Sequence, residues 1–333
     1  MKRDMLLVLG ACGQPGAELT LALRKIYGPF RVVAADTGPA TDSHPNDEPY
    51  EQLDVLDKEA LASIISRYNI TQIYHFATDE TATSCQFSTE AWRLNTQGLL
   101  NVLALAAEKG INKVFWPGSI AVLGPDAPRQ HCPQSAPANP VTPYGISKIA
   151  GELWCRYYWM RHGVDVRSLR YPGLISHKKR PGGGEVTDYV TDMFHGALKT
   201  QSYTCFLQEN TILPMMYMPD AVRATIELME APAAAISVRG SYNINAMNFS
   251  PRELALAIQR YIPELSITYK PDFRQSIAQG WPVSIDDSVA AADWKWEFTY
   301  SIAETVRHML THLSTGLDLT PGNIKQLHSQ VFF

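Results

Sequence analysis

Five short runs of mostly apolar residues indicate β-strands, and they lie at 5–9, 31–35, 72–76, 113–116 and 165–170. Longer segments with apolar residues at helical spacing alternate with these runs, near 58–68, 90–109 and 144–162. Strands that alternate with helices in this way are typical of a parallel sheet with helices on both faces. The pattern therefore predicts an α/β fold with a doubly wound parallel sheet.

A glycine-rich turn connects the first strand to the next helical pattern. Gly10, Gly13 and Gly16 follow the strand at 5–9, and apolar residues at helical spacing continue from 19 to 26. Glycines at such a turn allow close backbone approach, so that the helix amino terminus can receive a pyrophosphate. Strand, glycine turn and helix in this order predict a dinucleotide-binding Rossmann domain.

An acidic residue ends the second strand. Asp36 lies twenty residues after Gly16. A carboxylate at this position can accept both hydroxyls of an adenosine ribose and would repel a 2′-phosphate, which favours NAD over NADP. The alternative is that Asp36 only begins the following turn. Asp54 and Val55 are candidates for an adenine contact, although an acidic loop residue before a helix is also a common cap.

Tyr144 and Lys148 are four residues apart, which places them on one face of the helix at 144–162. A lysine ammonium beside a phenol lowers the phenol's pKa and makes it a general base near neutral pH. Ser119 ends a small-residue loop 25 residues before Tyr144, where a catalytic hydroxyl at a strand's carboxyl end is expected. The three predict proton and hydride chemistry on an alcohol, against the alternative of an exposed aromatic and a solvated charge. His75 is interpreted as a core residue.

The regular alternation of strands and helices ends near Pro172, and loops rich in glycine and proline follow. Helical segments follow near 186–199, 220–231, 251–261 and 301–313. We expect residues 1–172 to form the NAD-binding domain and 173–333 to form mainly a smaller, discontinuous substrate-binding lobe, with segments free to return to the first domain. The glycines at 182–184 give hinge freedom to a loop that closes over substrate, or else form a surface connection.

The composition argues against nucleic-acid-binding, metal-binding, membrane and secreted proteins. The 333 residues are 45% hydrophobic and 19% charged, enough for one large domain or two closely joined ones. A net charge of −4 gives no basic footprint for nucleic acid. Five scattered cysteines lack metal-ligand spacing, which predicts reduced thiols, no metal site and a cytoplasmic setting. No apolar run approaches the ~20 residues of a membrane span, and the first strand begins too early for a signal peptide.

Together, the three-glycine turn, Asp36, Ser119 and the Tyr-x-x-x-Lys pair resemble the extended short-chain dehydrogenase/reductases, the superfamily of NAD-dependent sugar-nucleotide epimerases and dehydratases. Longer stretches, among them GACGQ at 10–14, FWPGSIAV at 115–122 and RSLRYPGLIS at 167–176, resemble the short-chain-type L-threonine 3-dehydrogenases of this superfamily. The likeness covers nearly the whole chain. It implies NAD-dependent oxidation of L-threonine at C3 to 2-amino-3-oxobutanoate.

The resemblance also implies a role for particular positions. Tyr144 becomes the general base, Lys148 holds the nicotinamide ribose, and Ser119 bonds the reacting oxygen. The implied cofactor contacts are Gly10, Cys12, Gly13, Gln14, Asp36, Asp54, Val55, Ala77, Asn95, Tyr144, Lys148 and Tyr171. The implied substrate contacts are Thr81, Ser119, Tyr144, Gly184, Thr187 and Trp281, of which Trp281 has a core position as its alternative. The two long helices are candidate surfaces of a homodimer.

The chain departs from the resembled family near the substrate. Asp79 and Glu80 replace apolar residues, Gly118 replaces a serine, His177 replaces a tryptophan, and the loop at 181–188 is one residue longer. An alternative function is that of a sugar-nucleotide epimerase or dehydratase that keeps its NAD bound, which needs a larger pocket with basic residues for a diphosphate. A redox-sensing protein without catalysis is a third alternative, but it has no need of an intact serine, tyrosine and lysine set.

Overall fold

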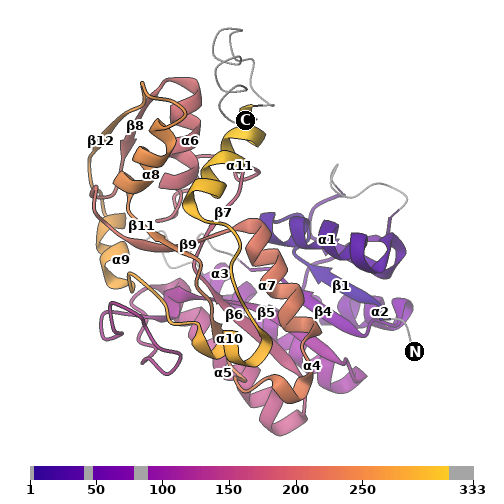
Figure 1. The fold of residues 1–333 in the computed structure, drawn as a ribbon. Coiled ribbons are helices and arrows are strands. Elements are labelled where there is room, and N and C mark those ends of the chain that lie inside the picture. Colours follow the sequence, from indigo (N-terminus) through magenta and orange to yellow (C-terminus); the bar gives the residue numbers. More distant parts are fainter. Residues whose placement is uncertain (1–3, 41–47, 79–88, 315–333) are drawn as a thin grey trace.

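A seven-stranded parallel sheet forms the centre of the protein (Figure 1). The computed structural model describes residues 4–40, 48–78 and 89–314. The strands follow the order β10-β6-β5-β4-β1-β2-β3 across the sheet. Their bounds are β1 Leu6–Leu9, β2 Val32–Asp36, β3 Tyr50–Gln52, β4 Gln72–His75, β5 Lys113–Ser119, β6 Val166–Tyr171 and β10 Tyr242–Asn243.

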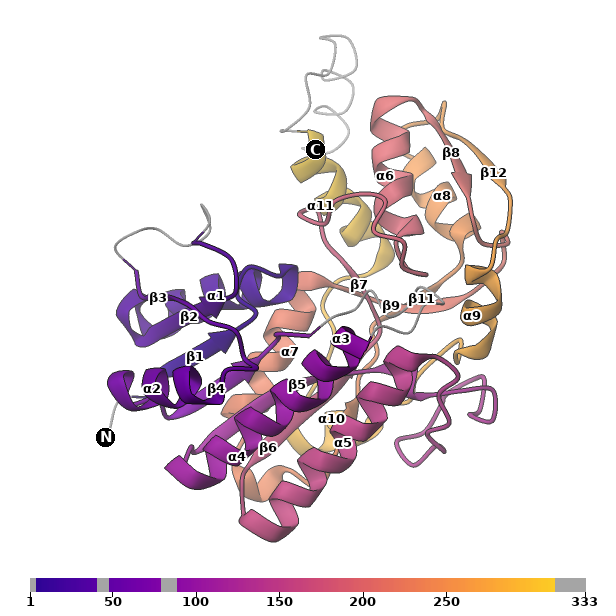
Figure 2. The same cartoon turned by 180° about the vertical axis from the view of Figure 1, so that it is seen from behind.

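Helices cover both faces of this sheet. One face packs against α1 (Gln14–Tyr27), α7 (Met218–Glu230) and α10 (Ser288–Trp294). The other packs against α2 (Lys58–Tyr68), α4 (Leu99–Lys109) and α5 (Pro143–His162), and Figure 2 shows α4 and α5 in front of the strands. Alternate residues of β1 enter the two cores, which is why its sequence is an unbroken apolar run. The predicted doubly wound parallel sheet is confirmed.

Local sequence signals set the ends of the helix that carries Tyr144 and Lys148. The hydroxyl of Thr142 accepts a hydrogen bond from the Gly145 N–H at 3.1 Å, and Pro143 occupies the first helical position. Gly163 ends the helix in the left-handed region, with φ at 68°. The structure therefore gives α5 the length that the sequence predicts.

The second long predicted helix, 90–109, is continuous but not uniform. It consists of α3 (Thr89–Arg93), a π-helical turn at Leu94–Gly98, and α4. Turns of this type occur often at functional sites. Here the turn brings Leu94 to the wall of the cavity described below.

The smaller lobe has its own core and its own short sheets, and it stands at the top in Figure 1. Its strands form the sets β11-β9-β7 and β12-β8. Their bounds are β7 Gly173–Ile175, β8 Ser202–Cys205, β9 Leu213–Tyr217, β11 Met247–Phe249 and β12 Ser266–Tyr269. Its helices are α6 Tyr189–Lys199, α8 Pro251–Gln259, α9 Arg274–Gly280 and α11 Ile302–Ser314. The chain leaves the central sheet after β6 and returns to it for α7, β10 and α10.

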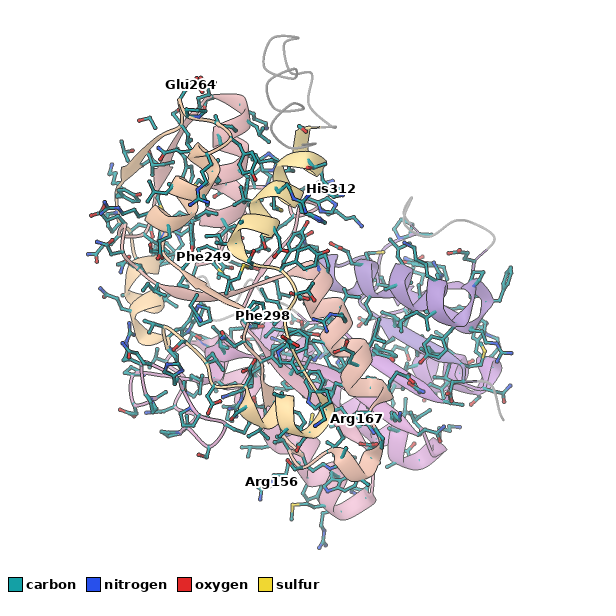
Figure 3. All side chains as sticks on the ribbon, in the orientation of Figure 1. Arg156, Arg167, Phe249, Glu264, Phe298 and His312 are labelled. Carbon is teal, nitrogen blue, oxygen red and sulfur yellow. The ribbon has the colours of Figure 1, made fainter. Side chains whose placement is uncertain are left out.

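A buried arginine holds one of the returning segments against the sheet. Arg167 on β6 donates from Nη1 to the carbonyls of Leu228 (2.6 Å) and Ala231 (2.7 Å), and its Nη2 pairs with Asp165 at 2.7 Å. Figure 3 shows Arg167 beside α7. The carbonyls at the end of α7, which have no partner within the helix, are thereby satisfied by a charged donor.

The described part of the chain contains neither a membrane-spanning helix nor a disulfide. Across 4–40, 48–78 and 89–314, no helix has the length and apolar character to cross a bilayer. The four cysteines in these ranges, Cys12, Cys132, Cys155 and Cys205, are free thiols, and Cys85 lies outside them.

Candidate active site

A cavity of about 490 Å³ opens where the carboxyl ends of the parallel strands face the smaller lobe. A second hollow of about 390 Å³ continues from it toward the end of β2. The two are one groove, because the same residues line both: Gly10, Gly13, Phe76, Thr78 and Leu94. Ligands of open α/β sheets bind at this end of the strands.

The glycine turn between β1 and α1 forms the floor of the groove. Gly10 has φ at 79°, and a Cβ on it would lie 2.5 Å from the Ala77 nitrogen. A Cβ on Gly16 would lie 2.1 Å from the carbonyl oxygen of Gly10. Only glycines fit these two positions, and α1 begins at Gln14 with no side chain capping it. The open helix amino terminus and the bare turn fit a pyrophosphate.

Asp36 stands at the end of β2, in the wall of the second hollow. One carboxylate oxygen accepts the Cys12 N–H at 2.8 Å, and the other accepts the Thr37 N–H at 2.8 Å. Each carboxylate oxygen can accept about two hydrogen bonds, so acceptor capacity remains for ligand hydroxyls. The predicted residues Asp54, Val55 and Ala77 line the same hollow. This wall fits the ribose and base of an adenosine.

Tyr144 and Lys148 lie on the first turns of α5 and both line the larger cavity. The Lys148 side chain is buried, with 1% of the residue exposed, and its Nζ donates to the Pro117 carbonyl at 2.8 Å. The same nitrogen lies 5.3 Å from the ring centroid of Tyr144 and 4.8 Å from that of Trp116. A fixed, buried ammonium beside a phenol is an arrangement that favours the phenolate.

Ser119 also lines this cavity, at the end of β5. The sequence predicts that this strand ends at 116, but its pairing with β6 continues until Ser119 faces Tyr171. Gly118 makes the extension possible, since a Cβ there would lie 2.6 Å from the Ser241 hydroxyl and 2.8 Å from the Leu169 carbonyl. The glycine at 118 thus has a steric reason in this chain.

The substrate side of the cavity contains some, but not all, of the residues implied by the resemblance. Thr187 and Trp281 line it. Arg129 fixes the latter by donating from Nη1 to the Trp281 carbonyl at 2.7 Å. Gly184 is not part of the lining, although its neighbour Gly183 is. Thr81, with Asp79 and Glu80, lies outside the described residues.

The remaining predicted cofactor residues divide between the groove and the layer behind it. Gln14 and Tyr171 line the larger cavity, and Cys12 lines the second hollow. Asn95 is buried and lines neither, but its side-chain nitrogen lies 3.3 Å from the Ser147 hydroxyl on α5. It packs against α5, the helix that carries Tyr144 and Lys148, and can help to position it.

His177, the departure from a tryptophan, packs away from the cavity lining. Its ring stacks on His312 of α11 with 4.3 Å between ring centroids, and its Nδ1 lies 3.4 Å from the Tyr217 hydroxyl. Burial, and then the neighbouring His312, lower the pKa of His177 to about 4. The imidazole is therefore neutral at physiological pH and joins the smaller lobe by ring packing.

Two charged residues of the cavity wall carry no signal in the sequence. Lys179 and Glu185 line the cavity and pair at 2.8 Å. Lysine at 179 belongs to a short basic run, 178–180, and the glutamate follows three glycines, which are contexts of ordinary solvated charges. Apolar lining residues were also not predicted: Phe76, Leu94, Val186 and Met218.

Comparison with known proteins identifies the class. The family model described as "NAD dependent epimerase/dehydratase family" matches residues 6–245. The chain belongs to this family of extended short-chain dehydrogenase/reductases. An uncharacterized epimerase/dehydratase of Staphylococcus aureus (strain USA300) is 41% identical over 312 residues, which are 93% of this chain and 96% of that protein.

Among solved structures, this chain is similar to L-threonine dehydrogenases. A GalE-like L-threonine dehydrogenase from Cupriavidus necator, in its holo form, is 52% identical, with a TM-score of 0.89 over 93% of this chain and all of that chain. The L-threonine dehydrogenase from Clostridium difficile is 41% identical, with a TM-score of 0.90 over 95% of this chain and 99% of that one. The predicted membership of the superfamily, and the resemblance to its L-threonine 3-dehydrogenases, are confirmed.

Proposed function

We propose that this protein oxidises L-threonine at C3 with NAD and forms 2-amino-3-oxobutanoate. The observation that carries the proposal is the meeting of Ser119, Tyr144 and Lys148 in one cavity that continues into the groove ending at Asp36. The likeness to L-threonine dehydrogenases at 41% and 52% identity supports the choice of substrate.

In this proposal the side chains of the cavity move one proton and hold one oxygen. The Tyr144 phenolate takes the proton of the C3 hydroxyl as the C3–H bond breaks. Ser119 donates a hydrogen bond to the same oxygen while it becomes a carbonyl. Lys148, fixed on the Pro117 carbonyl, keeps its ammonium beside the phenol and stabilises the phenolate.

The groove fits NAD, on the bare glycine turn and the Asp36 carboxylate. Gly10, Gly13 and the start of α1 would hold the pyrophosphate, and Asp36 would accept the adenosine ribose hydroxyls. When bound, NAD supplies the hydride acceptor, C4 of its nicotinamide ring. Tyr171, at the carboxyl end of β6, would stand near that ring.

The charge of the cavity disfavours a sugar-nucleotide substrate. Among the described residues that line it, the basic side chains are Lys148 and Lys179. The first is assigned to the tyrosine, and the second already pairs with Glu185 and Asp188 at 2.8 and 2.7 Å. A diphosphate would bring its negative charges to a wall where no described ammonium is available for it.

We further propose that the protein is a homodimer joined through α5. One face of this helix carries exposed apolar side chains: Ile146, Leu153, Trp154, Tyr157 and Met160. The opposite face carries Lys148 and packs on the sheet, so a partner on the exposed face would not obstruct the active site. A contiguous exposed apolar face commonly marks an interface. The cytoplasmic setting stays a prediction.

The proposed reaction is tested with purified protein, NAD and four compounds: L-threonine, D-threonine, L-serine and UDP-glucose. We expect an increase in NADH absorbance with L-threonine and little or none with the other three. An inert mixture with L-threonine, together with NAD that remains bound through purification and conversion of UDP-glucose, would instead establish the epimerase alternative.

A further inference from the structure

One wall of the cavity carries a cluster of three charges. Lys179 Nζ lies 2.8 Å from a carboxylate oxygen of Glu185 and 2.7 Å from one of Asp188. Lys179 and Glu185 line the cavity, whereas the Asp188 side chain is buried, with 1% exposed. One ammonium and two carboxylates leave this wall with a surplus negative charge.

The two carboxylates have different environments. Asp188 accepts the Glu185 N–H at 2.8 Å, and a Cβ on Gly183 would lie 2.9 Å from the same oxygen. Asp188 is therefore enclosed by its own loop and holds Lys179 in place. Burial lowers the pKa of Lys179, but the charges of Glu185 and Asp188 outweigh it and raise that pKa above its usual value, so the ammonium stays protonated. Glu185 is the carboxylate of the cluster that is partly exposed, with 25% of its side chain accessible and its residue in the cavity lining.

We propose that Glu185 determines substrate specificity by binding the α-ammonium of the amino-acid substrate. This inference rests on the proposed function, and it adds a recognition element that Ser119 and Tyr144 lack. Those two residues contact only the hydroxyl at C3, which simple hydroxy acids also possess. A carboxylate that shares its charge with one lysine has capacity for a second cation, and a substrate ammonium completes the pairing.

The position of Glu185 in the loop supports this role. Gly182 and Gly184 have φ at 81° and 88°, so the backbone before Glu185 follows a path that other residues rarely adopt. This path brings Glu185 into the cavity wall, together with the lining residues Val186 and Thr187.

The test compares Glu185→Gln with wild type for two ligands that share the C3 hydroxyl. The first is L-threonine, measured by KM and kcat from NADH formation. The second is (R)-3-hydroxybutyrate, which lacks the ammonium, measured as a competitive inhibitor against L-threonine. Loss of a hydrogen-bonded charge pair should raise the KM for L-threonine by about 10- to 100-fold, with kcat and the KM for NAD little changed. The inhibition constant of (R)-3-hydroxybutyrate should stay equal or fall.

Two further variants separate recognition from folding. Glu185→Asp keeps the charge and should recover part of the L-threonine affinity. Glu264→Gln makes the same chemical change at an exposed site at the tip of the smaller lobe (Figure 3) and should behave as wild type. An unchanged KM for L-threonine in Glu185→Gln, or a parallel loss of affinity for both ligands, would overturn the inference. Absence of L-threonine oxidation by the wild type would instead reject the proposed function, before any variant is made.

Discussion

Asp36 shows how one side chain can select the cofactor. Its two carboxylate oxygens already hold the backbone of the glycine turn and of the next loop, through Cys12 and Thr37. The same oxygens face the hollow in which we propose the adenosine ribose. In this proposal the residue has a structural function and a recognition function at once.

Replacement of Asp36 by alanine should weaken the preference for NAD over NADP. Hydrogen bonds to a charged acceptor are lost, so we expect kcat/KM with NAD to fall about 10- to 100-fold. The value with NADP should fall less, because the repulsion of its 2′-phosphate is also removed. Steady-state kinetics with both cofactors measure the ratio, and a ratio equal to that of wild type would reject the ribose contact.

His75 gives the protein an acid-sensitive site in its core. The ring is fully buried, and burial, followed by the charge of Lys148, lowers its pKa to about 3. An unfolded histidine titrates near 6.5, so the unfolded state binds the extra proton between about pH 6.5 and 3. The stability due to neutral His75 is present above about pH 6.5 and is lost as the pH falls toward 3.

Replacement of His75 by leucine should therefore flatten the pH dependence of folding. Between pH 7 and 5 the wild type should lose about 2 kcal/mol more unfolding free energy than His75→Leu. Urea denaturation at both pH values measures the difference. His131→Asn, at an exposed position with φ at 47°, is the control and should follow the wild type. Equal losses in all three proteins would show that His75 does not control the acid sensitivity.

Site residues that belong to motifs with a fixed backbone geometry were predictable from the sequence. In the glycine turn and in the tyrosine-lysine pair, the geometry of the turn and of the helix determines which residues lie close together, so the sequence spacing is enough to predict it. Glu185 and Lys179 gave no such signal, since they meet through the fold of a glycine-rich loop. The contact of Asn95 with Ser147 on α5 depends on how two helices pack, which its own sequence context does not specify.

A close backbone contact holds the start of helix α5, which carries Tyr144 and Lys148. A Cβ on Gly145 would lie 2.2 Å from the Ala121 carbonyl oxygen, in the segment that follows Ser119. The helix start and the serine loop are thus held together at a distance that only glycine allows. The contact sets the spacing between Tyr144 and Ser119.

Gly145→Ala should separate these two elements. We expect unfolding free energy to fall by about 1–3 kcal/mol, and kcat/KM to fall about 100-fold if Tyr144 shifts by about 1 Å. Gly280→Ala has no atom within 4 Å of the added carbon and should change stability by less than about 1 kcal/mol. Full activity in Gly145→Ala would show that the contact does not position the base.

Long elements were predicted well and short strands were not. The helices at 58–68 and 144–162 have clear periodicity and recognisable ends, and five strands of the first sheet are visible as short apolar runs. Strand β10 consists of Tyr242–Asn243 alone, and β7 and β11 have three residues each, too few for a period of two to be visible. Their pairing partners lie far away in the chain, so tertiary packing decides them.

The path of the chain couples the central sheet to the smaller lobe. The segment after β6 builds the smaller lobe, yet α7, β10 and α10 return to the first core. Helix α7 therefore serves both parts, because it packs on the sheet and contributes Met218 to the cavity wall. The sequence predicts a discontinuous lobe, but not which segments return.

Disruption of the apolar face of α5 should change the oligomeric state. Leu153 is 60% exposed and lies on the face opposite Lys148, so Leu153→Glu would place a charge in the proposed dimer interface. Light scattering after gel filtration should give two chains for the wild type and one for the variant. Leu256→Glu, on α8 and 54% exposed, is the matched control and should remain dimeric. A monomeric wild type would reject the dimer.

The central claim is that Tyr144 removes the hydroxyl proton during NAD-dependent oxidation of L-threonine, and one comparison tests it most directly. NADH formation from L-threonine is measured for wild type and Tyr144→Phe, with NAD affinity measured for both by fluorescence titration. We expect NADH from the wild type, turnover at least about 100-fold slower in the variant, and NAD affinity similar in the two proteins. A Tyr144→Phe protein that turns over L-threonine at a rate close to wild type would contradict the account.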